Sequence, residues 1–516
     1  MSLFAQLTLG LPIVLVLAGA LMILLKLPDS ASRWLGLATV VGSAALLVVS
    51  VLMALTPADS YPSSFFRLMG IQIHLDSLSV FFVLLINVIM LAASWNALSY
   101  LEGRTANSFL QKPAVFHTLI NFFHFTMLLV PMLDNLVGVW IAIELTTLGS
   151  AFLVAFHGRR SSWEAAWKYL IITSTGITLA LLGTVFLAKA IPDPYISDID
   201  ALNWTALMKF AGEKALQANF VWLAFLFALV GYGTKAGLAP MHTWLPDGHR
   251  EAPSPISALL SGVLLKAALY AILRFYTLTN LVLGDSKQTS TAILIVSLFS
   301  LIVATPLILK KNRFKRVLAY HSLEHMGIIT FGLALGGPIA IFGALLHSLN
   351  HAITKALMFL AFGNVIKQYD ERGIQEKEIM GVLKSMPLTG GILTLGGFAL
   401  VGAPPFNIFM SEFIILWGAF RQFWLPKEFA PWVVGLAIGV FAFSTTLIFF
   451  GLVRHLGKIV LNQSSGYDRI EKLSWSKTAP LVMLASLMLA LGVWIFPFLA
   501  NLINASVRVV LLGQAQ

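Results

Sequence analysis

Apolar stretches about 20 residues long follow one another along the chain, and each could form a helix that crosses a bilayer. Composition agrees, because 58% of the 516 residues are hydrophobic and 11% are charged, whereas soluble domains carry about 25% charged residues. We therefore predict an all-α polytopic membrane protein of about 14 transmembrane helices with no large soluble domain. The predicted spans are residues 6–26, 33–56, 76–100, 115–132, 135–156, 164–189, 219–246, 253–277, 291–309, 317–335, 338–366, 387–423, 431–458 and 477–503.

The distribution of positive charge predicts how these spans are oriented. The formal net charge is +11, which by itself could indicate a nucleic-acid partner. However, most lysines and arginines lie in loops that follow odd-numbered spans, with the densest run, "KKNRFKR", at 310–316. Cytoplasmic loops carry such an excess. We therefore predict a bacterial or archaeal cell (inner) membrane protein with cytoplasmic basic loops and both termini on the outer face. No nucleic-acid partner is expected.

Two further features limit the chemistry. The chain contains no cysteine, which excludes disulfides, thiolate metal sites and iron–sulfur clusters. We expect no cofactor in this chain, so any redox centres would belong to a partner. The first apolar run lacks a clear small-residue cleavage site, and we interpret it as a retained span rather than a signal peptide.

Two predicted spans are interrupted by glycine and proline, at "KAGLAP" (235–240) and "GAPP" (402–405). Proline lacks an amide donor and clashes with the preceding turn, so each helix should unwind there. The breaks fall in spans 7 and 12, and paired broken helices are typical of inverted repeats around a transport site. We predict helices 1–3 in residues 1–114, one repeat in 115–277 (helices 4–8), a second in 291–458 (helices 9–13), and helix 14 with the tail in 477–516. Ordinary proline kinks are the alternative.

Ionisable residues occur at mid-membrane depth, where each needs a partner, a cavity or a function. Those in the predicted spans are Glu144, Lys235, Lys266, His347, His351, Lys355 and Glu412. His347, His351 and Lys355 are spaced four residues apart, which places them on one helical face. Buried ion pairs that only stabilise packing are the alternative for each residue. Seven such residues in both halves favour a proton relay, because lysine, glutamate and histidine can all exchange protons. Lys168 and Arg274 are weaker candidates, since both lie near span ends where their side chains could reach the interface.

The segment "HSLEH" at 321–325 matches a zinc-protease pattern. Two histidines four apart with a glutamate could bind zinc, but the pattern is short and no third ligand is evident. We favour His325 as a further relay group and predict no metal site. An intramembrane zinc hydrolase remains an alternative that metal analysis would test.

Several segments together resemble the antiporter-like subunits of respiratory complex I and its relatives, over about residues 115–458. They are "DNLVGVWIAIELTTLGSAFLV", "GTKAGLAPMHTWLPDGHREAPSPISALLSGVLLKAALY", "KRVLAYHSLEHMG", "LLHSLNHAITKALMFL" and "GAPPFNIFMSEF". The phrase "RRSSWEAAWKYLII" is similar to the hydrogenase-4 branch. Sodium/proton antiporter subunits of the Mrp type and the membrane subunit of an inorganic-carbon uptake complex share these motifs.

The resemblance implies a fold of fourteen helices with two inverted five-helix repeats. It also implies that Glu144 and Lys235 form the pair that controls proton loading, and that Lys266 is a relay lysine. His325 and His351 match histidines of the family's central hydrophilic axis, and Lys355 matches the family's lysine four residues after His351. Glu412 matches the acidic residue of the twelfth span, at the end of that axis. Lys266 departs from the hydrogenase-4 pattern, which has an uncharged polar residue there.

The predicted function is proton translocation by a subunit of a multi-subunit membrane complex, driven by a partner's chemistry. The expected partners are the lipid bilayer and other subunits. These would include a hydrogenase-type arm or, in the inorganic-carbon alternative, a soluble zinc subunit resembling a carbonic anhydrase. Sodium/proton exchange is the remaining alternative. The chain itself is expected to be a transport subunit without a catalytic residue.

Overall fold

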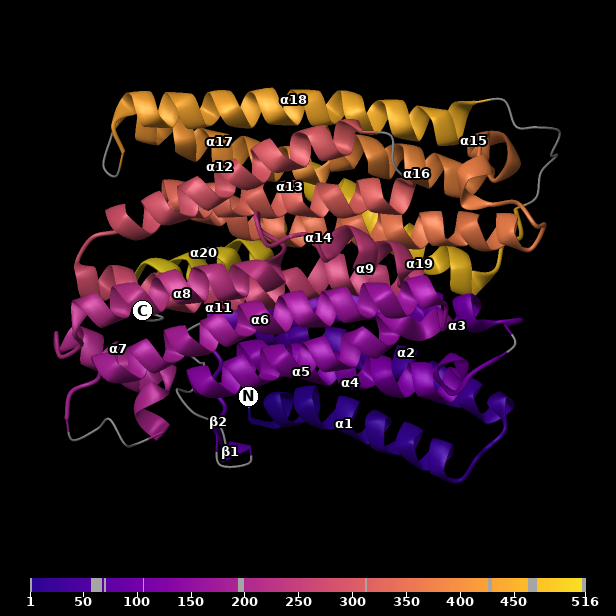
Figure 1. The fold of residues 1–516 in the computed structure, drawn as a ribbon, viewed down its shortest axis with the longest axis horizontal. Coiled ribbons are helices and arrows are strands. Elements are labelled where there is room, and N and C mark those ends of the chain that lie inside the picture. Colours follow the sequence, from indigo (N-terminus) through magenta and orange to yellow (C-terminus); the bar gives the residue numbers. More distant parts are fainter. Residues whose placement is uncertain are drawn as a thin grey trace.

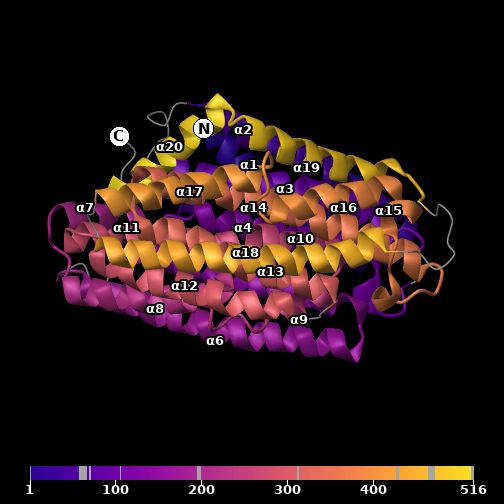
Figure 2. The same ribbon diagram turned by 90° about the horizontal axis from the view of Figure 1, so that it is seen from above.

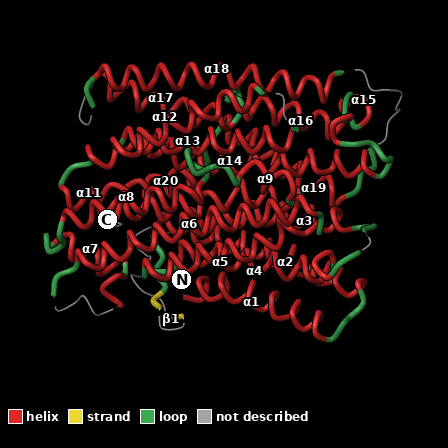
Figure 3. The backbone as a smooth tube through the Cα atoms, viewed as in Figure 1, coloured by secondary structure: helices red, strands yellow, loops and turns green. Residues whose placement is uncertain are grey.

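The structure, a computed structural model, describes residues 2–56, 67–68, 71–104, 106–193, 199–310, 313–425, 429–462 and 471–512. Helices dominate these residues (Figure 3). In the first half they are α1 (Ser2–Leu24), α2 (Asp29–Leu55), α3 (Ser77–Leu101), α4 (Pro113–Met132), α5 (Leu136–Val154), α6 (Arg160–Ala190), α7 (Trp204–Gly212), α8 (Ala218–Ala236), α9 (Leu245–Glu251), α10 (Ser254–Leu259) and α11 (Leu265–Leu283). In the second half they are α12 (Lys287–Leu309), α13 (Phe314–Leu335), α14 (Gly337–Asp370), α15 (Val382–Ser385), α16 (Pro387–Leu400), α17 (Asn407–Trp424), α18 (Pro431–Leu461), α19 (Trp475–Val493) and α20 (Pro497–Leu512).

The prediction of an all-helical multi-pass membrane protein is confirmed. In the described part of the chain, 12 helices are long and apolar enough to cross a membrane. The polar helix α13 and the broken pair α16–α17 occupy the positions of the two other predicted spans. The described residues also include one short antiparallel pair of strands, β1 (Arg67–Leu68) and β2 (Ile71–Gln72).

The long helices run side by side along the longest axis of the molecule, with α1 and α18 at opposite edges of the bundle (Figure 1). In the view from above, α14 lies inside the bundle among α3, α13 and α17 (Figure 2). In α3 and in α10–α11 every residue of the most apolar 18-residue stretch is buried, and in α14 94% of that stretch is buried. Helices α11 and α14, which carry Lys266, His347, His351 and Lys355, are therefore held inside the bundle.

Both predicted helix breaks are present. Helix α8 ends at Ala236, and Gly237 adopts a left-handed φ of 76°, which a residue without Cβ adopts at little cost. The unwound backbone is satisfied by protein groups, because Ser300 of α12 accepts from the amide of Ala239 at 3.0 Å. Trp244 also donates its indole N–H to the carbonyl of Thr234 at 2.9 Å. The break is thus an ordered element of the fold.

The second break separates α16 from α17. Gly402 has a φ of 69°, and Asn407 begins α17. Asn350 of α14 donates to the backbone carbonyl of Asn407 at 2.6 Å, and Asn407 donates in return to the carbonyl of Asn350 at 3.2 Å. The two amides therefore tie the broken helix to α14. The boundaries of the two repeats stay a prediction.

The structure differs from the sequence-based prediction in two places. The fourteenth segment, 477–503, is not one helix, because α19 ends at Val493 and α20 begins at Pro497. Proline at a helix start has no amide to contribute to the preceding turn, which explains the interruption. The eighth span contains a π-helical turn at Leu260–Leu264, directly before Lys266, which hydrophobic periodicity does not reveal.

Candidate functional site

The first group of predicted site residues lies where α5, α6 and α8 meet. The side-chain amine of Lys235, at the end of α8, donates to the hydroxyls of Thr147 and, at 3.2 Å, Tyr169. Thr147 in turn donates to the carboxylate of Glu144 at 3.4 Å, and Ser174 donates to the same carboxylate at 2.6 Å. Glu144 and Lys235 are therefore connected through Thr147, as an acid–base pair separated by one hydroxyl.

Close packing of α6 against α8 holds Lys235 in this position. A Cβ added at Gly231 would lie 2.5 Å from the backbone nitrogen of Ala180 and 2.6 Å from the carbonyl oxygen of Gly176. Only glycine allows the two backbones to approach so closely. Tyr169 of α6 then lies with its ring centroid 5.3 Å from the amine of Lys235.

The second group is a continuous set of contacts across α11, α13, α14 and α17. The amine of Lys266 contacts Nδ1 of His351 and donates to the carbonyl of Ser261 at 2.8 Å. The rings of His351 and His325 lie 4.8 Å apart between centroids. His325 Nδ1 is 3.0 Å from His347 Nε2. Four predicted residues from three helices are therefore in direct succession.

This succession reaches the second helix break. His347 Nδ1 lies 3.0 Å from the hydroxyl of Ser411, the neighbour of Glu412. Ligand atoms of His325, His347 and Glu412 all lie within 4.8 Å of one another. A Cβ on Gly402 would be 2.3 Å from Oε2 of Glu412, so the carboxylate lies against the unwound backbone. The break therefore provides the space that this carboxylate occupies.

Lys355 takes a separate direction from the histidines of α14. Its amine donates to the backbone carbonyl of Leu318 and lies 5.4 Å from the ring centroid of Phe359. Its electrostatic partner is Glu324 of α13, which is 3% exposed. Glu324 also accepts a hydrogen bond from His321 Nδ1 at 2.7 Å.

Glu324 is the functional candidate that the sequence reasoning missed. The segment "HSLEH" indicates a zinc pattern and, through His325, a relay group, but a glutamate at that depth carries the same signal as Glu144. The ligand atoms of His321, Glu324 and His325 do lie within 4.8 Å of one another. His249 is a second buried ionisable residue outside the predicted site. It is fully buried and stacks on Phe359 with 5.0 Å between ring centroids.

The structure does not bring all predicted residues together. No contact in the described part of the chain joins the Glu144–Lys235 pair to Lys266, so a proton passing between them needs an intervening carrier such as water. The carboxylates at the two ends of the series, Glu144 and Glu412, are half-buried, whereas the lysines and histidines between them are buried.

The two weaker candidates form ion pairs. Arg274 does not reach the interface as expected, because it is 2% exposed and makes a bidentate pair with Asp76 at 2.7 and 2.9 Å. Lys168 pairs with Asp247 at 2.9 Å, and Arg316 contacts the same carboxylate at 3.0 Å. These contacts join α3 to α11 and α6 to α9 and α13, which indicates structural roles.

Comparison with known proteins decides the family. Residues 134–436 match the model described as "NADH:quinone oxidoreductase/Mrp antiporter, TM". The chain belongs to this family. A hydrogenase-4 component F homolog of Methylacidiphilum infernorum is 37% identical over 395 residues, covering 76% of this chain and 80% of that protein. NADH-quinone oxidoreductase subunit N of Desulforudis audaxviator is 27% identical over 446 residues, covering 86% and 84% of the two chains.

Solved structures show the same fold. A chain of the membrane-bound sulfane sulfur reductase, an archaeal respiratory membrane complex, superposes with a TM-score of 0.82 at 23% identity and covers 99% of both chains. A chain of the Mrp complex from Dietzia sp. gives a TM-score of 0.81 at 18% identity, covering 100% of this chain and 99% of that chain. As a family member, the chain is an antiporter-like, proton-translocating subunit of complexes of the complex I, Mrp and hydrogenase type.

Proposed function

We propose that protons cross this chain along Glu144, Lys235, Lys266, His351, His325, His347 and Glu412, with Lys355 and Glu324 as a branch. The observation that carries the proposal is the succession of contacts from Lys266 through His351, His325 and His347 to Ser411 beside Glu412. The rings of His351 and His325 lie 4.8 Å apart between centroids, and hydrogen-bond contacts join the other members. Each side chain in this succession except Ser411 can both bind and release a proton.

The chemistry of the series suits proton transfer between neighbours. An ammonium at Lys266 can give its proton to Nδ1 of His351, leaving a neutral amine and an imidazolium. A neutral histidine is a donor at one ring nitrogen and an acceptor at the other, so His325 and His347 can pass a proton by changing tautomer. The final acceptor is the carboxylate of Glu412. Because these groups are buried, each charged state is costly unless its neighbour compensates, which couples successive transfers.

The loading step is assigned to the Glu144–Lys235 pair. A carboxylate close to a desolvated lysine favours the ammonium, and the apolar surroundings favour the neutral amine. The Thr147 hydroxyl between them transmits the carboxylate's influence. A change at Glu144, which is half-buried, would thus change the charge of Lys235.

The half-buried ends of the series support a role within an assembly. A half-buried carboxylate at membrane depth is costly in contact with lipid, so neighbouring subunits would cover Glu144 and Glu412. The relative named as a hydrogenase-4 component F homolog favours a hydrogenase-type arm as the source of the driving force. The membrane subunit of an inorganic-carbon uptake complex is the second candidate, and an Mrp-type sodium/proton exchanger is the third. We also infer that basic loops face the cytoplasm of a bacterial or archaeal cell and that both termini face outside.

The deciding experiment uses two substitutions at one position in the intact complex. Lys235→Ala should reduce proton translocation to background. Lys235→Arg should stay defective, because a guanidinium keeps its proton at any accessible pH. Proton flux in vesicles is measured together with the amount of assembled complex, which should be unchanged. Full transport by the arginine variant would mean that Lys235 is only a fixed positive charge, and the relay would be refuted.

Partner identity is tested separately by purifying the intact complex. Co-purification of a nickel–iron hydrogenase arm would support the leading assignment, and a soluble zinc protein would support inorganic-carbon uptake. Sodium-dependent proton flux would instead favour the exchanger.

A further inference from the structure

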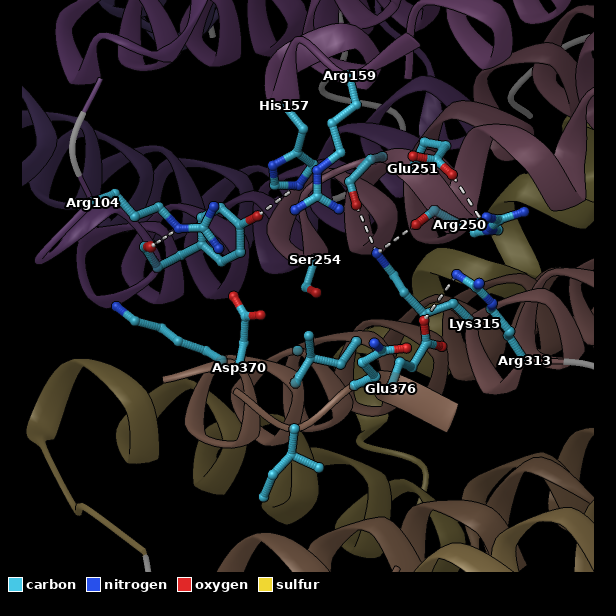
Figure 4. Close-up of a pocket in the computed structure, with 17 residues that line it drawn as sticks. Arg104, His157, Arg159, Arg250, Glu251, Ser254, Arg313, Lys315, Asp370 and Glu376 are labelled. Atoms are coloured by element: carbon cyan, nitrogen blue, oxygen red, sulfur yellow. Dashed lines mark hydrogen bonds and ion pairs between the residues drawn. The ribbon is translucent and has the colours of Figure 1, made fainter. Parts of the chain in front are cut away.

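A polar cavity of about 300 Å³ lies outside the proposed relay, at the end of the bundle that carries the basic loops (Figure 4). It is enclosed by the end of α3, the segment before α6, the short helix α9, the start of α13 and the end of α14 with the loop that follows. Its basic lining residues are Arg104, Arg159, Arg250, Arg313, Lys315 and Lys367, and its acidic ones are Glu251, Asp370 and Glu376.

Two of the three acids are neutralised within the lining. Arg250 pairs with Glu251 at 3.3 Å, and Arg313 approaches Glu376 at 4.0 Å. Among the described residues, no carboxylate lies within 4.0 Å of the charged groups of Arg104, Arg159, Lys315 or Lys367, although Asp370 also lines the cavity. The cavity therefore carries an excess of positive charge.

The unpaired cations are close enough to repel one another. Arg104 and Arg159 both act electrostatically on the Tyr100 and His157 side chains, which contact each other at 3.1 Å. Glu376 and Glu251 attract the amine of Lys315, and Arg104 repels it. Among the described residues this amine donates to the backbone carbonyls of Ala252 at 2.7 Å and Arg250 at 3.4 Å. Like charges held in this way destabilise the site unless an anion offsets them.

Positive loops alone do not account for this arrangement. A membrane protein concentrates basic residues on one side, and Arg104, Arg159 and Arg313 are indeed exposed. Here they come from segments up to 263 positions apart, from Arg104 to Lys367, and line one cavity. In Figure 4 the Arg159 guanidinium is drawn between His157 and Glu251, and Ser254, which is 4% exposed, is drawn near the centre of the view.

We propose that this cavity binds an anion bearing a phosphate group. Guanidinium groups match phosphate oxygens with paired hydrogen bonds, and the lysine and serine side chains supply further donors. The volume is at the lower end for ligand pockets, so it admits a free phosphate or the headgroup of an anionic lipid but no larger molecule in full. A bound phosphate would link α13 and α14, the helices that carry His325, His347 and His351, to the preceding segments.

Binding is tested on the purified full-length protein in nanodiscs of phosphatidylcholine, by thermal unfolding at constant ionic strength. Potassium phosphate is titrated against potassium chloride, and a second series replaces part of the lipid with phosphatidylglycerol. Arg159→Gln should lower the apparent phosphate affinity, measured from this stabilisation, by at least about tenfold, as expected for loss of a charged hydrogen-bond donor. Arg160→Gln removes an exposed positive charge at the next position, outside the lining, and should leave binding unchanged.

Asp370→Asn should have the opposite effect to Arg159→Gln. It removes the acid that has no ion-pair partner in the lining, so the anion should bind about threefold more tightly or better. Saturable stabilisation by inorganic phosphate identifies a free anion as the ligand, and stabilisation by phosphatidylglycerol alone identifies a lipid headgroup. The proposal is overturned if neither stabilises the protein, or if Arg159→Gln and Arg160→Gln have equal effects. It is also overturned if Asp370→Asn weakens binding.

Discussion

The ion pair between Asp76 and Arg274 offers a quantitative test of how the relay's scaffold is stabilised. Both residues are almost completely buried, at 6% and 2% exposure, and the guanidinium also donates to Tyr270 at 2.7 Å. Asp76→Asn would leave a buried guanidinium without its counter-charge, and losses of about 3–5 kcal/mol are usual for such changes. We expect the free energy of unfolding to fall by about that amount.

The measurement is a titration with denaturing detergent, followed by the fluorescence of the chain's 13 tryptophans. Lys168→Gln is the matched control, because Lys168 and Asp247 are 2.9 Å apart, against 2.7 Å for Arg274 and Asp76, but their side chains are 45% and 24% exposed. Exposed pairs contribute about 0–1 kcal/mol. The double variant Asp76→Asn/Arg274→Met removes both charges and should be less destabilised than the single one. A loss in Asp76→Asn no larger than in Lys168→Gln would contradict the assignment of a buried stabilising pair.

Four further predictions follow from named contacts. Glu144→Gln should lower proton flux by at least about tenfold without loss of assembly, because it removes the group that favours the charged form of Lys235; wild-type flux would rule out the loading role. Glu324→Gln should impair flux while Lys168→Gln does not, and equal flux in both variants would remove Glu324 from the relay. Burial lowers the pKa of His74, but Asp76 and Asp134 together raise it above its usual value. Its contribution to stability should therefore be present below about pH 6.5 and lost as pH rises through the raised folded-state pKa, and this dependence should be smaller in Asp76→Asn. Cysteines introduced at Arg313 and Lys214, both exposed, should react with an impermeant reagent from opposite sides of the membrane, and labelling from one side would refute the proposed topology.

The choice of labelling positions illustrates what the structure adds. Asp134, a natural choice from the sequence, is 1% exposed and accepts a hydrogen bond from Thr205 at 2.7 Å, so a cysteine there would be poorly accessible. Position 312, in the densest basic run, lies outside the described residues. Hydropathy identifies loops, but it does not distinguish a loop residue packed under another segment from one in water.

The sequence by itself determined the helical class, the approximate spans and both helix breaks. The reason is that the bilayer imposes a length and a polarity on every span, and glycine with proline interrupts helices locally. It also determined that His347, His351 and Lys355 share one side of a helix, because helical periodicity is a local property. The residues at membrane depth were evident for the same reason, since a charge there is unusual in any fold.

Only the tertiary structure decided which of these residues meet. The spacing on α14 groups Lys355 with the histidines, yet its amine turns toward Leu318 and Glu324, because the neighbouring helix supplies those acceptors. Three further features depend on contacts between distant parts of the chain. They are the position of Thr147 between Glu144 and Lys235, the pairing of Arg274 with Asp76, and the cavity lined by segments from Arg104 to Glu376. Such contacts arise from how helices pack, and a single sequence read by local pattern does not specify that packing.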